Sequence, residues 1–141
     1  ADFAFENAEA FPGCLLVLTD DDDGPRPHVL LFADYLRRAL AATCDAADSA
    51  LQRYRPQPLE VLAGSVPLLR AFGIVAGGWQ LMRGAVAAQK KLDAGETDPF
   101  YTSKILTARF FADHVLSAAR GLAYTVKNGG TAAVAITDEM F

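Results

Sequence analysis

The sequence predicts an all-α protein, an up-down bundle of three to four long helices that follows an irregular N-terminal region. Apolar residues recur at intervals of three and four over three long segments, as they do on the buried face of a helix. Prolines stand where these segments would begin or end. The alternating pattern of a nucleotide-binding α/β sheet is missing. We therefore expect an irregular linker or short helical segment over residues 1–27 and a helical bundle domain over residues 28–141.

Length and composition limit the classes of protein to which this chain can belong. Its 141 residues suit one domain with its own core, and 52% apolar residues argue against intrinsic disorder. Thirteen basic and 17 acidic residues give a net charge of −4, which disfavours non-specific binding to nucleic acid. The uncharged run in the apolar middle, Ala71–Met82, is too short for a bilayer, which requires about 20 residues. We expect no nucleic-acid partner, no transmembrane segment and a cytoplasmic location.

The N-terminal region contains an acidic run, Asp20–Asp23, followed by Gly24 and two prolines. An EF-hand calcium loop with Gly24 at its sixth position would need acidic residues where Thr19 and Leu30 stand. We therefore interpret the run as a solvated acidic loop.

The first long helix is expected from about His28 to Tyr54. Pro25 and Pro27 precede it, and Pro56 ends it because proline lacks the backbone N–H that a helix interior needs. Charged residues fall largely outside its predicted buried stripe, which has helical spacing. This stripe contains Leu31, Tyr35, Ala39, Ala42, Ala46, Ala50 and Tyr54.

The second helical segment is expected over residues 59–92, and Pro67 splits it into a short helix at 59–65 and a long one. Glycines inside the long helix cost about 1 kcal/mol each relative to alanine. We interpret Gly73 and Gly77, which lie one turn apart, as positions where another backbone approaches closely. They do not form a dinucleotide-binding loop, because the GxGxxG spacing and a preceding strand are both missing.

The third helix has the clearest boundaries. Asp98 can cap its first turn, Pro99 suits the first helical position, and Asn128 with the two glycines after it predicts a left-handed cap. Its apolar residues repeat every 3.5 residues, the period of helices packed nearly parallel in a bundle. This seam contains Tyr101, Ile105, Ala108, Ala112, Val115, Ala119, Leu122 and Val126.

Side chains that could carry chemistry are scattered along the chain. His28 and His114 have no nucleophile or carboxylate partner that the sequence places beside them. Cys14 and Cys44 fit no zinc-ligand or CxxC spacing; a structural disulfide between them stays open, and idle thiols are the simpler interpretation. The sequence therefore predicts no catalytic, cofactor-binding or metal-binding residue in this chain.

Three stretches together resemble a known family. They are Pro67–Met82, which contains the glycines and Trp79, then Phe100–Lys104, then Thr107–Leu116. In this order they are similar to the extra C-terminal helical domain of a subset of acyl-CoA dehydrogenases, those like 3-methylmercaptopropionyl-CoA dehydrogenase. The resemblance covers roughly residues 58–130. We expect packing roles, not catalytic ones, for Gly73, Gly77, Trp79, Tyr101, Lys104, Arg109, Phe110 and Phe111.

The resemblance implies a parent enzyme that is an FAD-dependent flavoprotein, an oxidoreductase acting on the Cα–Cβ bond of an acyl-CoA. Such enzymes pass their electrons to an electron-transfer flavoprotein. Their flavin-binding domain and catalytic glutamate lie upstream of this domain, so no catalytic residue of the family maps onto this chain.

We accordingly expect a structural and assembly domain that holds no cofactor and is inactive alone. Its partners would be the remainder of the dehydrogenase polypeptide and a second subunit of a homodimer. The alternative is a standalone helical module that binds a small hydrophobic or acyl ligand, with Trp79 and the phenylalanines lining its pocket.

Overall fold

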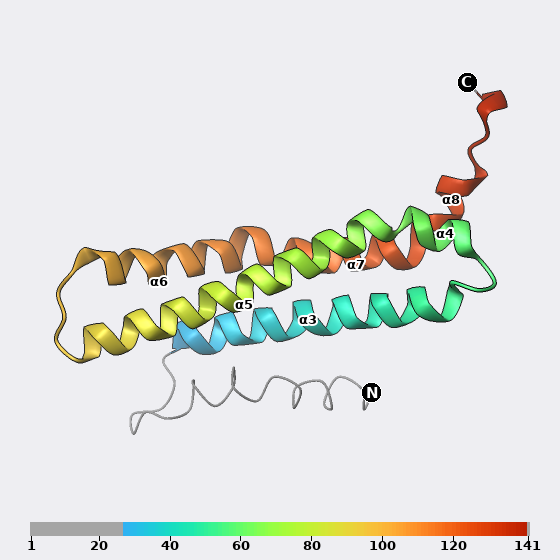
Figure 1. Cartoon of the computed structure of the whole chain (residues 1–141). Coiled ribbons are helices and arrows are strands. Elements are labelled where there is room, and N and C mark those ends of the chain that lie inside the picture. Colours follow the sequence, from blue (N-terminus) through green and yellow to red (C-terminus); the bar gives the residue numbers. More distant parts are fainter. Residues whose placement is uncertain (1–26, 141) are drawn as a thin grey trace.

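The computed structural model describes residues 27–140, and this part of the chain is helical without any strand. Three long rods form its body, with each rod antiparallel to the one before it (Figure 1). The rods are α3 (Pro27–Arg53), α5 (Ser65–Asp93) and a composite of α6 (Pro99–Phe111), the π-helical turn η1 (Ala112–Leu116) and α7 (Ala118–Asn128). The all-α, up-down bundle predicted from the sequence is confirmed.

Shorter elements lie at or beyond one end of the bundle. They are α4 (Pro58–Ala63), α8 (Gly130–Ala135) and the 3-10 turn η2 (Asp138–Met140). Helix α8 packs against α4, although about 70 residues separate them in the sequence (Figure 1). Along the body, α5 contacts both other rods, whereas α3 contacts α5, η1 and α7.

The helix boundaries follow from local chemistry that the sequence already displays. Pro67 lies in the first turn of α5, where its missing N–H would have no intrahelical partner anyway, so α5 begins at Ser65 rather than at the proline. The Asp98 carboxylate accepts a hydrogen bond from the Phe100 N–H at 2.9 Å and caps α6 as predicted. Gly95, with φ of +91°, takes the left-handed conformation in the turn between α5 and α6.

The left-handed cap predicted after Asn128 is wrong. Gly129 has φ of −81° and ψ of −16°, in the right-handed region, and the chain continues directly into α8. Close packing, not a left-handed conformation, calls for glycine here: a Cβ on Gly129 would lie 2.8 Å from the Thr125 carbonyl oxygen, and Gly130 is buried against the backbone of Glu60 in α4. The Thr131 hydroxyl and the Glu60 carboxylate lie 3.0 Å apart in a hydrogen bond at the same contact.

The buried face of α3 differs from the stripe that the sequence predicted. Tyr35 and Tyr54 are 39% and 54% exposed, because the helix is rotated so that Phe32 and Leu36 enter the core. Thr43 is fully buried and satisfies its hydroxyl by donating to the Ala39 carbonyl at 2.8 Å. The buried positions are Phe32, Leu36, Ala39, Thr43, Ala46 and Ala50, which recur every three or four residues.

The seam of the third rod is interrupted by the π-helical turn, which the sequence analysis did not anticipate. A π-helical turn contains an extra residue, so it rotates the residues that follow it relative to a regular helix. Ala108, Ala112, Ala119 and Val126 of the predicted seam are buried. Leu116 and Ala123 are buried in addition, whereas Val115 and Leu122 are only partly buried.

Two features of the sequence analysis lie outside the described residues. The N-terminal region with its acidic run and Cys14 is not among residues 27–140, so the boundary expected between residues 27 and 28 stays a prediction. Cys44, which is partly buried on α3, forms no disulfide with any described residue.

Candidate packing and docking surfaces

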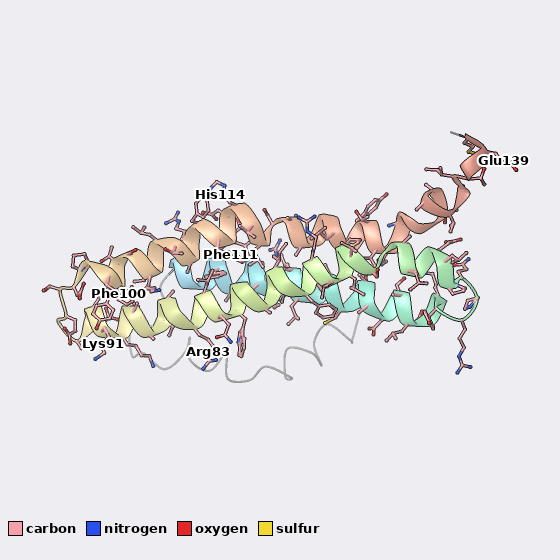
Figure 2. All side chains as sticks on the ribbon, turned by 45° about the horizontal axis from the view of Figure 1, so that its top comes forward. Arg83, Lys91, Phe100, Phe111, His114 and Glu139 are labelled. Carbon is pink, nitrogen blue, oxygen red and sulfur yellow. The ribbon has the colours of Figure 1, made fainter. Side chains whose placement is uncertain are left out.

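The glycines of α5 differ in what surrounds them. A Cβ on Gly77 would lie 3.4 Å from Cζ of Phe111, and one on Gly78 would lie 3.2 Å from Cδ1 of Leu116. Phe111 is partly buried in the core, and Figure 2 shows it between α6 and α5. Gly73, in contrast, is exposed, and a Cβ there would meet no atom within 4 Å. Close packing therefore surrounds Gly77 and Gly78 but not Gly73.

Trp79 packs against the core cluster from the side of α5. The guanidinium carbon of Arg83, one turn later, lies 5.0 Å from the centre of the indole ring. This is a cation–π contact, and Arg83 is exposed at the surface (Figure 2). Trp79 is therefore a part of the bundle core whose outer edge is covered by a charged side chain.

Tyr101 and Lys104 lie in the first turns of α6, and both contact the ring of Phe100. The rings of Tyr101 and Phe100 meet edge to face with centroids 5.8 Å apart, and the Lys104 ammonium lies 4.9 Å from the Phe100 ring. Tyr101 is partly buried, whereas Phe100 and Lys104 are exposed. Phe100, Tyr101 and Lys104 therefore form a local cluster within one helix.

Arg109 and Phe110 lie on the outer side of α6. Arg109 Nε is 3.9 Å from Asp113 Oδ2, a long and exposed ion pair that contributes little to stability. Phe110 is 61% exposed and stacks on the His114 ring at a centroid distance of 4.4 Å. His114 points away from the bundle in Figure 2.

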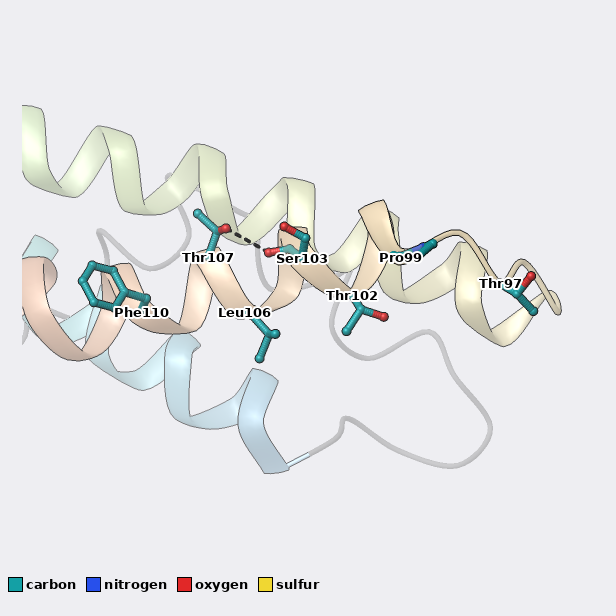
Figure 3. A pocket seen from close by; sticks show the side chains of 7 residues that line it. All are labelled: Thr97, Pro99, Thr102, Ser103, Leu106, Thr107 and Phe110. Carbon is teal, nitrogen blue, oxygen red and sulfur yellow. Dashed lines mark hydrogen bonds between the residues drawn. The ribbon is translucent and has the colours of Figure 1, made fainter.

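A shallow groove of about 670 Å³ runs along this outer side of α6 (Figure 3). Hydroxyl groups dominate its polar part, and the Thr107 hydroxyl is bonded to the Ser103 carbonyl at 2.8 Å. Phe110 lines this groove, whereas Trp79, Phe100 and Phe111 do not. The lining residues are Thr97, Pro99, Thr102, Ser103, Leu106, Thr107 and Phe110.

Titratable groups with altered pKa values are few among the described residues. Burial, reinforced by the charge of Asp48, raises the pKa of the Cys44 thiol. Hydrogen bonds from Arg37 and then Arg38 hold the pKa of the Asp34 carboxyl below its usual range. No group of three or more His, Cys, Asp or Glu side chains in residues 27–140 is placed to hold a metal ion.

The lowered pKa of Asp34 predicts how stability depends on pH. The ionised carboxylate forms ion pairs with Arg37 at 2.8 Å and Arg38 at 2.7 Å. Its contribution to the stability of the fold is therefore complete above the pKa that Asp34 has in the unfolded chain. That contribution is lost as the pH falls through the folded-state pKa. We expect Asp34→Asn to lower the melting temperature at neutral pH and to match the wild type in strong acid. Thermal unfolding followed by circular dichroism at both pH values measures this difference.

Asp113→Asn provides a matched control for Asp34→Asn, because its partner Arg109 is 3.9 Å away. We expect a smaller effect at neutral pH. High salt should shrink the Asp34 effect, since exposed ion pairs are screened. An Asp34→Asn effect that persists undiminished in strong acid would contradict the assignment to the ion pairs.

Polar contacts that the sequence analysis missed tie the rods together at the α4 and α8 end. Arg53, at the end of α3, donates to the Val126 carbonyl of α7 at 3.0 Å. Lys127 Nζ lies 2.7 Å from Asp45 Oδ2 of α3. These pairs are 73 and 82 residues apart in sequence, so no local pattern could have indicated them.

The sequence analysis also did not predict an exposed apolar surface that the structure shows on α4 and α5. We define the α4–α5 apolar face as Leu59, Leu62, Val66, Leu69 and Phe72 together with the exposed small residues Gly73 and Ala76. Its large side chains are exposed by 43–73% and recur every three or four residues. The available signal was the low charge of the segment, in which Arg70 is the only charged residue between Ser65 and Met82.

This apolar character does not make any helix a membrane span. Within residues 27–140, no helix combines the length with the apolar character that crossing a bilayer requires.

Comparison with known proteins confirms the resemblance seen in the sequence. A family model described as "Acetyl-CoA dehydrogenase C-terminal like" matches residues 19–137. Over 84 residues the chain is 40% identical to 3-methylmercaptopropionyl-CoA dehydrogenase of Ruegeria pomeroyi (strain ATCC 700808 / DSM 15171 / DSS-3). That alignment covers 60% of this chain and only 14% of the relative, so the chain corresponds to a small part of that enzyme. Because the family model matches most of its residues, the chain belongs to the acetyl-CoA dehydrogenase C-terminal-like family.

Proposed function

We propose that this chain is the C-terminal structural and assembly domain of an FAD-dependent acyl-CoA dehydrogenase and does not itself catalyse the reaction. The observation that carries the proposal is the match of residues 19–137 to a family defined by the C-terminal part of such enzymes. This chain resembles a small part of a relative that is named as a dehydrogenase of an acyl-CoA. Oxidation of the acyl-CoA would then take place in portions of the parent polypeptide other than this bundle.

The groove on α6 does not fit FAD. The pyrophosphate of FAD is bound in proteins by cationic groups or free helix N-terminal N–H groups. The groove lining contains no charged side chain, and at the start of α6 the Phe100 N–H donates to the Asp98 carboxylate, which would repel an anion. We therefore place the flavin of the proposed parent enzyme outside this groove.

The same proposal includes the partners and place of the parent enzyme. The domain would contact the rest of its own polypeptide within a homodimer, in the cytoplasm. Electrons from the acyl-CoA would leave the parent through an electron-transfer flavoprotein. These assignments rest on the family and on the dehydrogenase relative.

The groove is also the observation that favours the second candidate, a standalone module for a small hydrophobic or acyl ligand. Leu106 and Phe110 offer apolar contacts there, and both are 61% exposed. Ligand sites usually enclose most of the ligand surface. An open groove along a single helix encloses little, so we favour the assembly role.

Two preparations test the proposal. The first is the 141-residue chain alone, and the second is the complete polypeptide encoded by the gene that contains it. We expect flavin absorbance and acyl-CoA oxidation only in the complete polypeptide. Removal of the 141 residues from it should impair subunit assembly, measured by analytical ultracentrifugation. Flavin binding or thioester oxidation by the chain alone would overturn the proposal, as would a complete gene product that lacks dehydrogenase domains.

A further inference from the structure

The first half of α5 is apolar on two opposite sides. Ala71, Val75 and Met82 face the core of the bundle and are at most 7% exposed. Leu69, Gly73 and Ala76 lie on the opposite side, since they are offset from the core positions by about half a helical turn. A helix that is apolar all round is normally buried within a larger structure.

Neither of the other rods has an outer surface of this kind. The outer surface of α3 carries Arg37, Arg38 and Asp45, and the outer surface of α6 and α7 mixes Leu106 and Phe110 with hydroxyl and charged groups. The α4–α5 apolar face also continues across two helices, because Gly64 joins them in a right-handed conformation (φ −84°, ψ −2°). A contiguous exposed apolar surface is typical of a site of interaction with another surface.

Gly73 lies on this face, and like Gly84 and Gly121 it has open space where a Cβ would be. A glycine in a helix interior costs about 1 kcal/mol relative to alanine. Gly77 and Gly78 offset that cost by admitting Phe111 and Leu116, but a Cβ on Gly73 would meet nothing within 4 Å. The bundle therefore gains no packing from Gly73, whereas a helix or loop of a docked domain could approach the backbone there.

We propose that the α4–α5 apolar face is the surface through which this domain docks onto the dehydrogenase domains of its own polypeptide. The inference rests on the proposed function and specifies its partner. The alignment with the dehydrogenase relative covers only 14% of that enzyme, so in a parent of similar length the polypeptide outside this domain would be long enough to provide an opposing surface. We expect that opposing surface to be apolar as well, because on this side Arg70 is the only charged residue between Ser65 and Met82.

Hydrogen exchange tests the location directly. Amide exchange is compared between the 141-residue chain and the complete polypeptide that contains it. We expect exchange over residues 59–76 to slow at least tenfold in the complete polypeptide. Residues 102–110 of α6, whose outer side includes exposed Leu106 and Phe110, are the internal reference and should change little.

Matched variants make the same test by mutation. Leu69→Lys and Leu106→Lys replace leucines that are 73% and 61% exposed, so both should leave the fold of the 141-residue chain unchanged. In the complete polypeptide, Leu69→Lys should abolish the protection at 59–76 and increase the radius of gyration, whereas Leu106→Lys should do neither. Gly73→Ala should raise the melting temperature of the 141-residue chain and weaken the protection in the complete polypeptide.

The outcomes separate the two proposals. A complete polypeptide without dehydrogenase domains defeats the proposed function, whereas a dehydrogenase without protection at 59–76 defeats the docking inference alone. Disruption by Leu106→Lys instead of Leu69→Lys would also overturn the inference. Concentration-dependent dimers of the 141-residue chain that protect residues 59–76 would assign the face to a second copy and overturn it as well.

Discussion

Replacing Leu116 with alanine is expected to lower the free energy of unfolding by about 3–5 kcal/mol, since buried leucine truncations in a packed core cost this much. Leu116 is 1% exposed and lies in the π-helical turn where the third rod meets α5 and α3. Its Cδ1 is close to Gly78, which has no side chain that could fill the cavity. Urea unfolding should show a lower midpoint with an unchanged slope.

Leu106→Ala is the control for this prediction, because Leu106 belongs to the same rod but is 61% exposed. We expect the free energy of unfolding to change by no more than about 0.5 kcal/mol. A double variant adds a sharper test, since a Cβ on Gly78 would lie 3.2 Å from Cδ1 of Leu116. Gly78→Ala should be destabilising alone and much less so beside Leu116→Ala. Additive effects of the two changes would show that they do not share this contact.

The bundle was predictable because its signals are local. Proline positions, the Asp98 cap and the three-four spacing of apolar residues each depend on neighbours within one or two turns. The misplaced details depend on neighbours far away in the sequence. Whether Tyr35 or Leu36 of α3 enters the core is decided by the shape of the facing rods, and Leu36 meets Gly78 there. The π-helical turn that buries Leu116 likewise has no signature in the spacing.

The candidate surfaces, like the fold, were predictable only where the signal is local in the sequence. The sequence indicates that glycines of α5 admit another helix, but only the structure distinguishes Gly77, which faces Phe111, from Gly73, which faces open space. Periodicity identifies apolar residues without stating whether the partner surface belongs to this domain. Leu62, Val66 and Leu69 therefore had the pattern of core residues, although the three rods leave them exposed. An apolar pattern typical of burial can therefore reflect an interface with another domain rather than the core of this one.

Replacing Gly130 with alanine is expected to destabilise the α4 and α8 end of the bundle by about 1–3 kcal/mol, the usual cost of forcing an extra methyl group into a packed site. The added Cβ would lie 2.5 Å from the Glu60 carbonyl oxygen and 2.9 Å from its carbonyl carbon. These are backbone atoms of α4, so they cannot move aside as a flexible side chain would. Helix α8 must therefore shift and stretch the 3.0 Å hydrogen bond between Thr131 and Glu60.

Gly121→Ala separates this steric effect from the general preference of helices for alanine. Gly121 lies inside α7, is exposed, and has no atom within 4 Å of its Cβ position, so alanine there should stabilise the chain by up to about 1 kcal/mol. Opposite signs for the two substitutions in urea unfolding are the expected result. Hydrogen exchange should also become faster in α8 and α4 for Gly130→Ala and remain unchanged there for Gly121→Ala. Stabilisation by both alanines would mean that α8 does not press against α4 in solution.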